Sequence, residues 1–281
     1  MADQILQIGH STIQHGKEND RVYLMKLADG DMPELLKKID LLALDNGYGK
    51  IFAKVPARWL SRFAEAGFSS EALVPMFFDG REDCHFMARY YDRQRSVEPA
   101  QREIAKVISL AREVNLKTGL KPARDYTIER CRQEDCPEMA ELFGTVFESY
   151  PFPVEDPDYI DQSMDSDVIY YGARDRNERL VSLASAELDP KAANVEMTDF
   201  ATVPAHRRKG LARRLLQIME EKMREKDMAI AYTIARAKSI GMNKTFAYAG
   251  YKYGGTLIRN TQICGRLESM NVWYKQLVDH S

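Results

Sequence analysis

Short apolar runs alternate with longer amphipathic ones along the second half of the chain. Runs of about four to eight apolar or alternating residues, bounded by turn signals, are typical of β-strands. The predicted strands cover residues 126–131, 168–173, 180–188, 195–203, 228–235, 253–258 and 269–274. Strands and helices in this mixed order predict an α/β sheet with helices packed on its faces.

Helical spacing of apolar residues predicts the elements between these strands. Residues 208–225 form a long amphipathic helix, and residues 238–249 form a helix that ends at a left-handed glycine. Asp135 is predicted to cap a further helix that runs to about residue 148. The next segment, residues 149–159, is interrupted by prolines and is predicted to be irregular.

A helix with a clear stop divides the chain into two predicted domains. Residues 96–119 show helical spacing, and a glycine and a proline then end the helix. We place the domain boundary near residue 123. This gives a smaller α/β domain at residues 1–123 and a second domain at residues 124–281, both of ordinary domain size.

Two short stretches indicate a partial internal repeat. The run 63-FAEAGF-68 is similar to 246-FAYAGY-251, and each follows a strand-like run, at residues 51–55 and 228–235. Similarity at a fixed place in a pattern of elements is a sign of repeat architecture. Chance similarity between two helix ends explains the same letters, so the sequence leaves both interpretations open.

Composition narrows the function classes. The 281 residues carry a formal net charge of −2, and the sequence pI of about 6.3 argues against a general nucleic-acid binder. No run approaches the roughly 20 apolar residues that span a bilayer, and the polar N-terminus lacks the order of a secretion signal. The four cysteines match no zinc spacing. We expect a cytoplasmic protein with free thiols and without metal, nucleic-acid or membrane partners.

Positive charge gathers around one glycine in 203-VPAHRRKGLARRLL-216. The basic residues are Arg207, Arg208, Lys209, Arg213 and Arg214, and the glycine is Gly210. The first turn of a helix has amide N–H groups without partners, and these favour an anion. A phosphate can approach Gly210 closely, and the guanidinium groups add charge-assisted contacts. A solvated basic helix face is the alternative.

These residues carry a resemblance to a known superfamily. Arg207-x-x-Gly210-x-Ala212 resembles the (Arg/Gln)-x-x-Gly-x-(Gly/Ala) motif of the GCN5-related N-acetyltransferases (GNAT), and the similarity covers residues 124–275. The runs 196-EMTDFATVP-204 and 241-GMNKTFAYAGYKYGGTLI-258 resemble the β-lysine N6-acetyltransferase family. The same holds for 268-ESMNVWYK-275, 10-HSTIQHGKENDRVYLMKL-27 and 50-KIFAKVP-56. The resemblance implies a GNAT-type mixed, mostly antiparallel sheet flanked by helices.

The resemblance also implies an activity. The donor would be acetyl-CoA and the acceptor the N6 amine of β-lysine, with direct transfer in a ternary complex and N6-acetyl-β-lysine, a compatible solute, as the product. Pantetheine would contact the backbone of Phe200, Ala201 and Thr202. The donor phosphates would meet the segment made of Arg207, Arg208, Lys209, Gly210, Leu211, Ala212 and Arg213.

Candidate catalytic residues follow from the same resemblance. Glu196 lies eleven residues before Arg207, where histone-type members carry their catalytic glutamate, and is our candidate base. Asp199 ranks second, because residues 196 and 199 face opposite sides of a regular strand. Many members have a tyrosine that protonates the leaving thiolate. This chain has Phe246 at that position, so Tyr248, two residues later, is the candidate acid. Asn243 is similarly the candidate CoA contact.

The acceptor side is less constrained by the sequence. Glu148 and Tyr150 lie in the loop where the superfamily places the acceptor, and we expect them and Asp199 to bind a cationic amine. The polar N-terminal run either covers the site or folds against its own sheet. Other acceptors, such as another small amine or a protein lysine, and a non-catalytic acyl-CoA sensor remain alternatives. The oligomeric state is open, a homodimer included.

Overall fold

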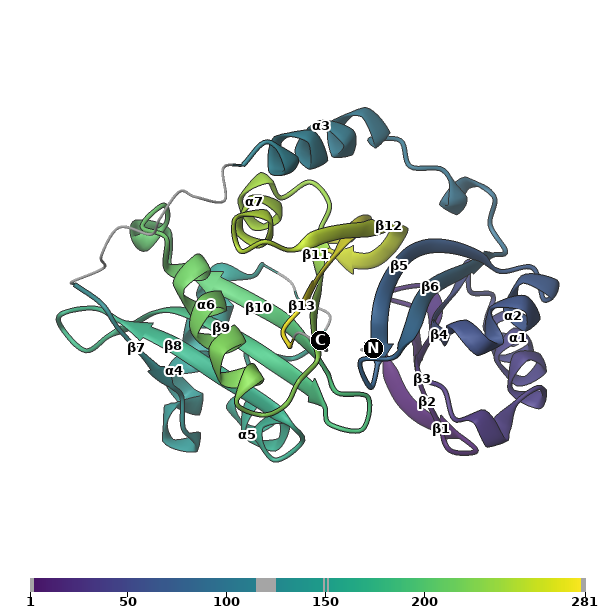
Figure 1. The fold of residues 1–281 in the computed structure, drawn as a ribbon, viewed down its shortest axis with the longest axis horizontal. Helices are drawn as coiled ribbons and strands as arrows, with labels where there is room; N and C mark the ends of the chain where they lie inside the picture. The colour runs from purple at the N-terminus through teal and green to yellow at the C-terminus, as the bar shows by residue number, and fades with distance from the viewer. Residues whose placement is uncertain (1–2, 115–124, 149, 151, 279–281) are drawn as a thin grey trace.

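The computed structural model describes residues 3–114, 125–148, 150 and 152–278. The strands of the first half are β1 (Gln4–Ile8), β2 (Ser11–Gly16), β3 (Arg21–Lys26), β4 (Lys50–Pro56), β5 (Ser69–Phe78) and β6 (Glu82–Tyr90). Its helices are α1 (Glu34–Asn46), α2 (Leu60–Glu65) and α3 (Gln101–Arg112). Helix α3 lies over the second half of the chain and packs against its helix α7 (Ile240–Tyr248) (Figure 1).

The second half contains the seven strands that the sequence predicts. They are β7 (Thr127–Arg130), β8 (Val168–Arg174), β9 (Leu180–Asp189), β10 (Asn194–Thr202), β11 (Ile230–Arg236), β12 (Lys252–Ile263) and β13 (Arg266–Gln276). Besides α7, its helices are α4 (Cys136–Val146), α5 (Pro157–Met164) and α6 (Leu211–Arg224). The predicted mixed α/β sheet is therefore confirmed.

All described strands join one 13-stranded sheet, whose order shows an internal repeat. The order is β1-β2-β3-β4-β6-β5-β12-β13-β11-β10-β9-β8-β7. Strands β1 to β6 follow the order 1-2-3-4-6-5, and strands β8 to β13 follow the same order in reverse direction across the sheet. Each half has one parallel pair, β3 with β4 and β10 with β11, and the other pairs are antiparallel. Figure 1 shows the two halves side by side.

The two similar sequence stretches occupy equivalent helix ends. In the first half, the amide of Phe68 donates to the carbonyl of Phe63 at 3.0 Å, and Gly67 has a φ of 85°. In the second half, Tyr251 donates to Phe246 at 3.1 Å, and Gly250 also has a φ of 85°. The ring pairs are edge-to-face in both, with centroids 5.0 and 5.1 Å apart. The interpretation as a partial repeat is confirmed.

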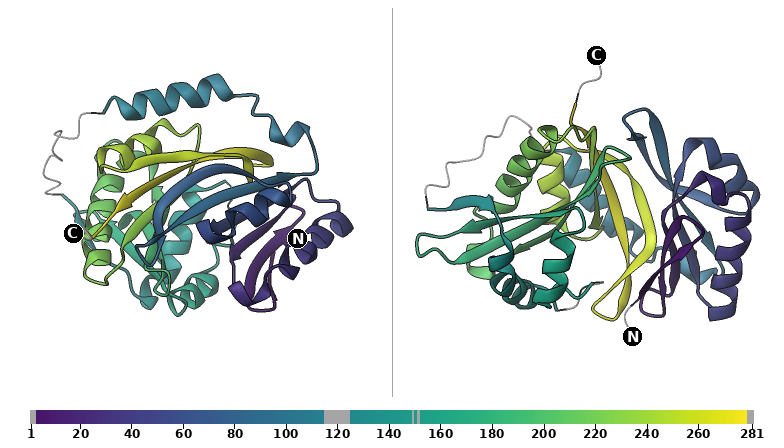
Figure 2. Two further views of the ribbon diagram at one scale, coloured as in Figure 1. Left: turned by 45° about the vertical axis from the view of Figure 1, so that its right-hand side comes forward. Right: turned by 90° about the horizontal axis from the view of Figure 1, so that it is seen from below.

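Side chains alternate between the two faces of each strand, and in the first half this gives one core beneath the helices and a second core that faces the other half. In β3, Val22 and Leu24 pack beneath α1, whereas Tyr23 between them joins a different cluster with Tyr232 and Met270 of the second half. Figure 2 shows α1 and α2 on the outer side of the first half. The inner faces of the two halves therefore pack against each other, and this is where a site between them can form.

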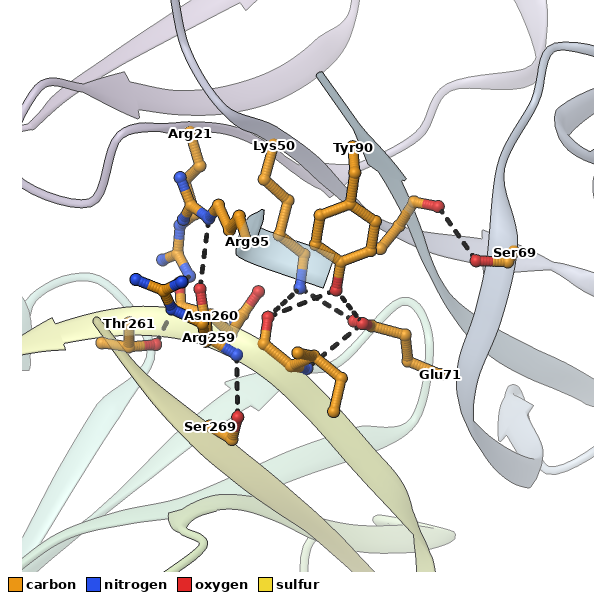
Figure 3. Close-up of polar contacts among 12 residues, drawn as sticks. Arg21, Lys50, Ser69, Glu71, Tyr90, Arg95, Arg259, Asn260, Thr261 and Ser269 are labelled. Carbon is orange, nitrogen blue, oxygen red and sulfur yellow. Dashed lines mark hydrogen bonds and ion pairs between the residues drawn. The ribbon is translucent and has the colours of Figure 1, made fainter. Parts of the chain in front are cut away.

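A polar junction joins the halves at β12 (Figure 3). The strand bulges between Leu257 and Thr261. Buried cations of the first half donate to successive carbonyls of this bulge: Lys50 to Ile258 at 2.8 Å, Arg95 to Arg259 at 3.3 Å, and Arg21 to Asn260. The carboxylate of Glu71 compensates Lys50 at 2.8 Å. Backbone groups, rather than apolar packing alone, thus fix the second half against the first.

The beginning of α6 differs from the predicted helix 208–225. The helix starts at Leu211, because Arg208 (φ 63°) and Gly210 (φ 78°) both lie in the left-handed region and form a tight turn instead. Helix α4, earlier in the chain, also ends before the predicted residue 148, at Val146. Asp135 occupies the N-cap position of α4, as predicted, but its carboxylate accepts from the amide of Arg132 at 2.8 Å and makes no hydrogen bond to the helix.

A helix also occurs within the segment predicted to be irregular. The carboxylate of Asp156 accepts from the amide of Asp158 at 3.0 Å and caps α5, and Pro157 is its first residue. Proline is favoured there because the first helical amides lack partners anyway. The predicted domain boundary near residue 123 lies outside the described residues, and the division into two domains stays a prediction. No helix in the described ranges is long and apolar enough to cross a bilayer.

Candidate active site

One large cavity, of about 1590 Å³, lies between the two halves. Tyr23 on β3 and Lys54 on β4 line it from the first half, and Glu196 on β10 and Tyr232 on β11 line it from the second. It also extends to the turn at Gly210. Sites for one small molecule usually occupy roughly 300–1,000 Å³. The cavity is therefore large enough for two ligands bound together.

The turn before α6 forms one end of the cavity. Gly210 caps the helix from a left-handed conformation, and the first amide of α6 with a described partner is that of Arg214, which donates to Gly210 O at 3.1 Å. The amides of the first helical turn before it have no intrahelical partner. The cavity wall here consists of His206, Arg207, Arg208, Gly210, Leu211, Ala212 and Arg213. The arrangement can bind an anionic group.

Strand β10 opens beside this turn. It pairs in parallel with β11 only over residues 194–196, and its register with β9 shifts between Thr198 and Ala201. Asp199 takes a φ of 53° in this bulge. Beyond the pairing the two strands separate, so the edge of β10 that faces β11 has no strand partner there, while the carbonyl of Thr202 accepts from Arg207 Nε at 3.1 Å. Phe200 and Thr202 line the cavity as expected, whereas the side chain of Ala201 is buried beside α4.

The bulge corrects one expectation about the two carboxylates of β10. On a regular strand Glu196 and Asp199 would face opposite sides, and only one would reach the site. The bulge inserts an extra residue and re-aims the strand, so both carboxylates line the same cavity. A third carboxylate, Glu187 on β9, lies directly opposite Glu196 in the antiparallel ladder and also lines it. Sequence reasoning missed Glu187.

Burial and mutual repulsion raise the pKa values of these carboxyl groups. Burial, with the charges of Glu196 and Asp199, raises the pKa of Glu187 to about 8, although water in the cavity reaches its side chain. Burial also raises the pKa of Glu196, while Lys54 and the Tyr232 hydroxyl favour its charged form. The set attracts a cation, because bringing in positive charge relieves the repulsion.

Asp199 is held by two hydroxyl groups. Ser185 donates to one carboxylate oxygen at 2.5 Å, and the hydroxyl of Tyr150 donates to the other. Tyr150 therefore reaches the cavity as expected, and Glu148 lies on its rim as an exposed side chain. Both oxygens of Asp199 therefore accept hydrogen bonds from side-chain hydroxyls.

Comparisons with known proteins identify the family of this chain. The profile of the acetyltransferase (GNAT) family matches residues 128–248. A protein of Methanococcus maripaludis named β-lysine N(6)-acetyltransferase is 35% identical over 273 residues, which is 97% of this chain and 98% of that protein. The chain belongs to the GNAT acetyltransferase family. The N-acetyltransferase YodP of Bacillus subtilis is 31% identical over 95% of this chain and 96% of its own length.

Two further proteins are similar to this chain. The β-lysine N(6)-acetyltransferase of Methanosarcina mazei is 29% identical over 88% of this chain and 98% of its own length. Among solved structures, the ribosomal-protein-S18-alanine N-acetyltransferase of Escherichia coli covers 56% of this chain at 13% identity and a TM-score of 0.49. This GNAT chain is an N-acetyltransferase, and its acetyl donor is acetyl-CoA.

The residues predicted to contact the donor phosphates line the cavity at the turn before α6, except Lys209. The glycine lets an anion approach the backbone, and the side chains of Arg207 and Arg213 reach the cavity wall. Lys209 does not line the cavity, and its ammonium lies 5.7 Å from the ring centre of Tyr126, so only its backbone amide, through which the contact is predicted, remains for the donor.

Asn243 is a second correction. We expected it to contact CoA, but it is fully buried and its hydrogen-bonding groups are used inside the protein. Its amide donates to the carbonyls of Arg236 (3.0 Å) and Ser239 (2.8 Å), and its oxygen accepts from Asn271 and Trp273, both at 2.8 Å. Asn243 thus connects α7 to β11 and β13 as a structural residue.

The expected acid, Tyr248, also lies away from the cavity. It is not among the cavity-lining residues, and its ring stacks 5.0 Å from the guanidinium carbon of Arg213. Phe246, two residues earlier, lines the cavity and packs edge-to-face on Phe200, with centroids 5.5 Å apart. A shift of two residues turns a side chain to the opposite face of a helix. The placement gives no support to Tyr248 as the proton donor.

No group of three or more His, Cys, Asp or Glu side chains that could hold a metal ion occurs in the described part of the chain. Cys84, Cys131 and Cys136 are buried thiols, and Cys264 is exposed.

The raised pKa of Glu187 predicts a pH-dependent gain in stability on its removal. An unfolded glutamate titrates near 4.3 and the folded one at about 8. The stability that its protonated form contributes is therefore complete below about pH 4 and lost as the pH rises through 8. We expect Glu187→Gln to exceed the wild type in free energy of unfolding, with a difference that grows from pH 5 to pH 8.5.

Denaturant unfolding at the two pH values measures this difference. Glu221→Gln on the exposed side of α6 is the matched control and should give the same small effect at both. A Glu187→Gln difference independent of pH would show that Glu187 titrates normally.

Proposed function

We propose that this GNAT enzyme transfers the acetyl group of acetyl-CoA to the N6 amine of β-lysine in a ternary complex. The observation that carries the proposal is the single cavity, which joins the basic turn at Gly210 to a chamber walled by Glu187, Glu196 and Asp199. Two relatives that match nearly the whole chain bear the name of this activity. Donor and acceptor can meet in such a cavity without a covalent enzyme intermediate.

The acceptor end of the cavity fits a diamine. β-Lysine brings two ammonium groups and one carboxylate at neutral pH. The three carboxylates of the chamber attract the ammonium groups, and Tyr150 and Ser185 hold Asp199 in place for one of them. Because the first half of the chain forms one wall of the chamber, a small amine fits better than the side chain of a folded protein.

Glu196 is the residue that we assign to proton transfer. An alkylamine has a pKa near 10.4 and arrives as ammonium, so it must lose a proton before it attacks a thioester. Burial raises the pKa of Glu196 above its usual value, which makes its carboxylate a stronger base than an exposed one. The nearby Tyr232 hydroxyl and the backbone N–H of Ile234 keep enough of it charged to accept that proton.

The donor end needs contacts for phosphates and for the thioester. The amides that begin α6, together with Arg207 and Arg213, are placed to hold the phosphates. The backbone of β10 beyond its bulge, at residues 200–202, is free to donate to the carbonyl oxygen as charge develops on it. No phenol faces this region from position 246, so we expect the thiolate, with a pKa near 8.5, to leave unassisted.

Acceptor preference tests the proposal. The purified protein is incubated with acetyl-CoA and β-lysine, α-lysine or a histone-like peptide, thiol release is followed, and the acetylated nitrogen is located by NMR. We expect the highest kcat/KM with β-lysine, by about tenfold or more over α-lysine, and acetylation at N6. A preference for the peptide, or acetylation at the amine next to the carboxylate-bearing carbons, would contradict the proposed function.

A further inference from the structure

The first half of the chain is a copy of the second half that lacks its donor-binding features. The turn equivalent to the Gly210 turn lies between β3 and α1 and contains Asp29 and Asp31 in place of arginines. Acidic residues there repel phosphate. In the parallel ladder of the second half, Glu196 pairs with Tyr232. In the equivalent ladder of the first half, Tyr23 pairs with Phe52, so a tyrosine takes the place of Glu196. The first half therefore has neither a phosphate turn nor a carboxylate base of its own.

What the first half presents to the cavity instead is the ammonium of Lys54. It lies between two aromatic rings, with its Nζ 5.6 Å from the centre of Tyr23 and 5.7 Å from that of Tyr232. It donates to the Tyr232 hydroxyl at 3.2 Å. An ammonium has three N–H groups, and the hydroxyl of Tyr232 accounts for one of them. No carboxylate within the described ranges forms an ion pair with Lys54.

Lys54 keeps its charge in this position. Although burial lowers the pKa of its ammonium, the nearby Tyr23 and Glu196 outweigh burial and raise it above its ordinary value. The other buried lysine of β4, Lys50, behaves differently. Burial lowers its pKa to about 8, and its ammonium is already used by Glu71 and a backbone carbonyl. Lys54 is thus a permanent cation that faces the acceptor chamber.

We propose that Lys54 is the receptor for the carboxylate of the acceptor. This inference rests on the proposed function, because it assumes that the acceptor is an amino acid with a second amine. Lys54 donates to the Tyr232 hydroxyl at 3.2 Å, and Tyr232 pairs with Glu196 in the parallel β10–β11 ladder, so the base and the ammonium share Tyr232 as a neighbour. Six bonds separate N6 from the carboxylate carbon of β-lysine, so an extended substrate has the length to pass Tyr232 and contact both groups.

The charges of the cavity give this contact its selectivity. An acceptor with two ammonium groups and one carboxylate pairs with both the acidic cluster and Lys54. A diamine has no carboxylate to offer. The ammonium of Lys54 then lies beside the substrate's own positive charge without an anionic partner. A charge-assisted hydrogen bond contributes about 1.5–3 kcal/mol, which corresponds to roughly 10–100-fold in kcat/KM. The repeat that lost donor binding would thus select the acceptor.

Pairs of acceptors that differ only in the carboxylate test the inference. β-Lysine is compared with 1,4-diaminopentane, and α-lysine with 1,5-diaminopentane. In the wild type we expect kcat/KM to favour the amino acid about 10–100-fold in each active pair. In Lys54→Met this preference should fall to near unity, through loss of the amino acid, while kcat/KM for the diamine changes less than about threefold. Lys54→Arg should retain part of the preference, because it keeps the positive charge.

Controls separate the remaining explanations. Lys38→Met, on the exposed side of α1, should leave both acceptors unchanged. An equal loss with both acceptors of a pair would mean that Lys54 acts on Glu196 rather than on the substrate, and would overturn the inference. If Lys54→Met does not fold, Lys54→Gln replaces it. If the wild type ignores β-lysine but prefers α-lysine over its diamine, the proposed function fails while the carboxylate receptor stands. If only diamines react, both fail.

Discussion

Replacing Glu196 with glutamine should lower kcat for acetyl transfer by about 10²–10⁴-fold and leave the Kd of acetyl-CoA within about threefold. The amide cannot accept the ammonium proton, whereas the substitution leaves the proposed phosphate site at the Gly210 turn unchanged. In the wild type, burial raises the pKa of Glu196, so kcat should rise with pH through that raised value and then level. In Glu196→Gln the rate should keep rising toward the pKa of the free amine, near 10.4.

Stopped-flow or steady-state thiol release over a range of pH measures this effect, with acetyl-CoA binding followed separately. Asp199→Asn is the matched comparison on the same strand, and we expect a smaller loss in kcat, because we assign Asp199 to binding the acceptor amine rather than to proton transfer. A Glu196→Gln variant that loses acetyl-CoA affinity as much as rate would identify Glu196 as structural.

Replacing Gly210 with aspartate should raise the Kd of acetyl-CoA by about 100-fold or more. The new carboxylate would stand at the start of α6, where the amides and arginines favour an anion, and would repel the phosphates. At an effective dielectric constant near 20, two unit charges about 4 Å apart interact by about 4 kcal/mol, more than two factors of ten in affinity. Isothermal titration calorimetry with acetyl-CoA gives the Kd directly.

Two variants separate charge from backbone strain in this experiment. Asn and Asp both tolerate the left-handed conformation that Gly210 adopts, so Gly210→Asn has the same shape without the charge and should weaken binding by only about tenfold. Gly47→Asp introduces the same residue at a φ of 67°, in open space at the end of α1, and should leave the Kd unchanged. Equal losses for Gly210→Asp and Gly210→Asn would contradict an anion site.

The parts of the fold that depend on local chemistry were predictable. The strands of the second half, the amphipathic α6 and the left-handed stop at Gly250 follow from apolar spacing and from glycine's tolerance of positive φ. The error at α5 came from treating Pro157 as a breaker, although proline at a first helical position supports a helix. Helix starts and ends were the least accurate, because caps depend on which side chains reach the free amides.

Candidate site residues were predictable where they belong to the motif or to the strand before it, and Glu196, Phe200 and Thr202 line the cavity as expected. The turn from Arg207 to Arg213 and the opening of β10 follow from a motif of contiguous residues. Asn243 has the right residue type at nearly the right place, yet its partners on β11 and β13 turn it into the core. Tyr248 does not line the cavity, because a two-residue offset on α7 turns it to another face of the helix than Phe246, which does.

The sequence by itself determined the order of strands and helices, the glycine turn that suits a phosphate, and the family to which the motif belongs. These depend on neighbours within a few residues, which sequence periodicity records. Only the tertiary structure decided that Asp199 joins Glu196 in one cavity, that Glu187 stands opposite them, and that Lys54 closes the chamber from the repeated first half. A bulge, a ladder register and the packing of two distant halves set these positions, and such long-range contacts leave no local pattern in the chain.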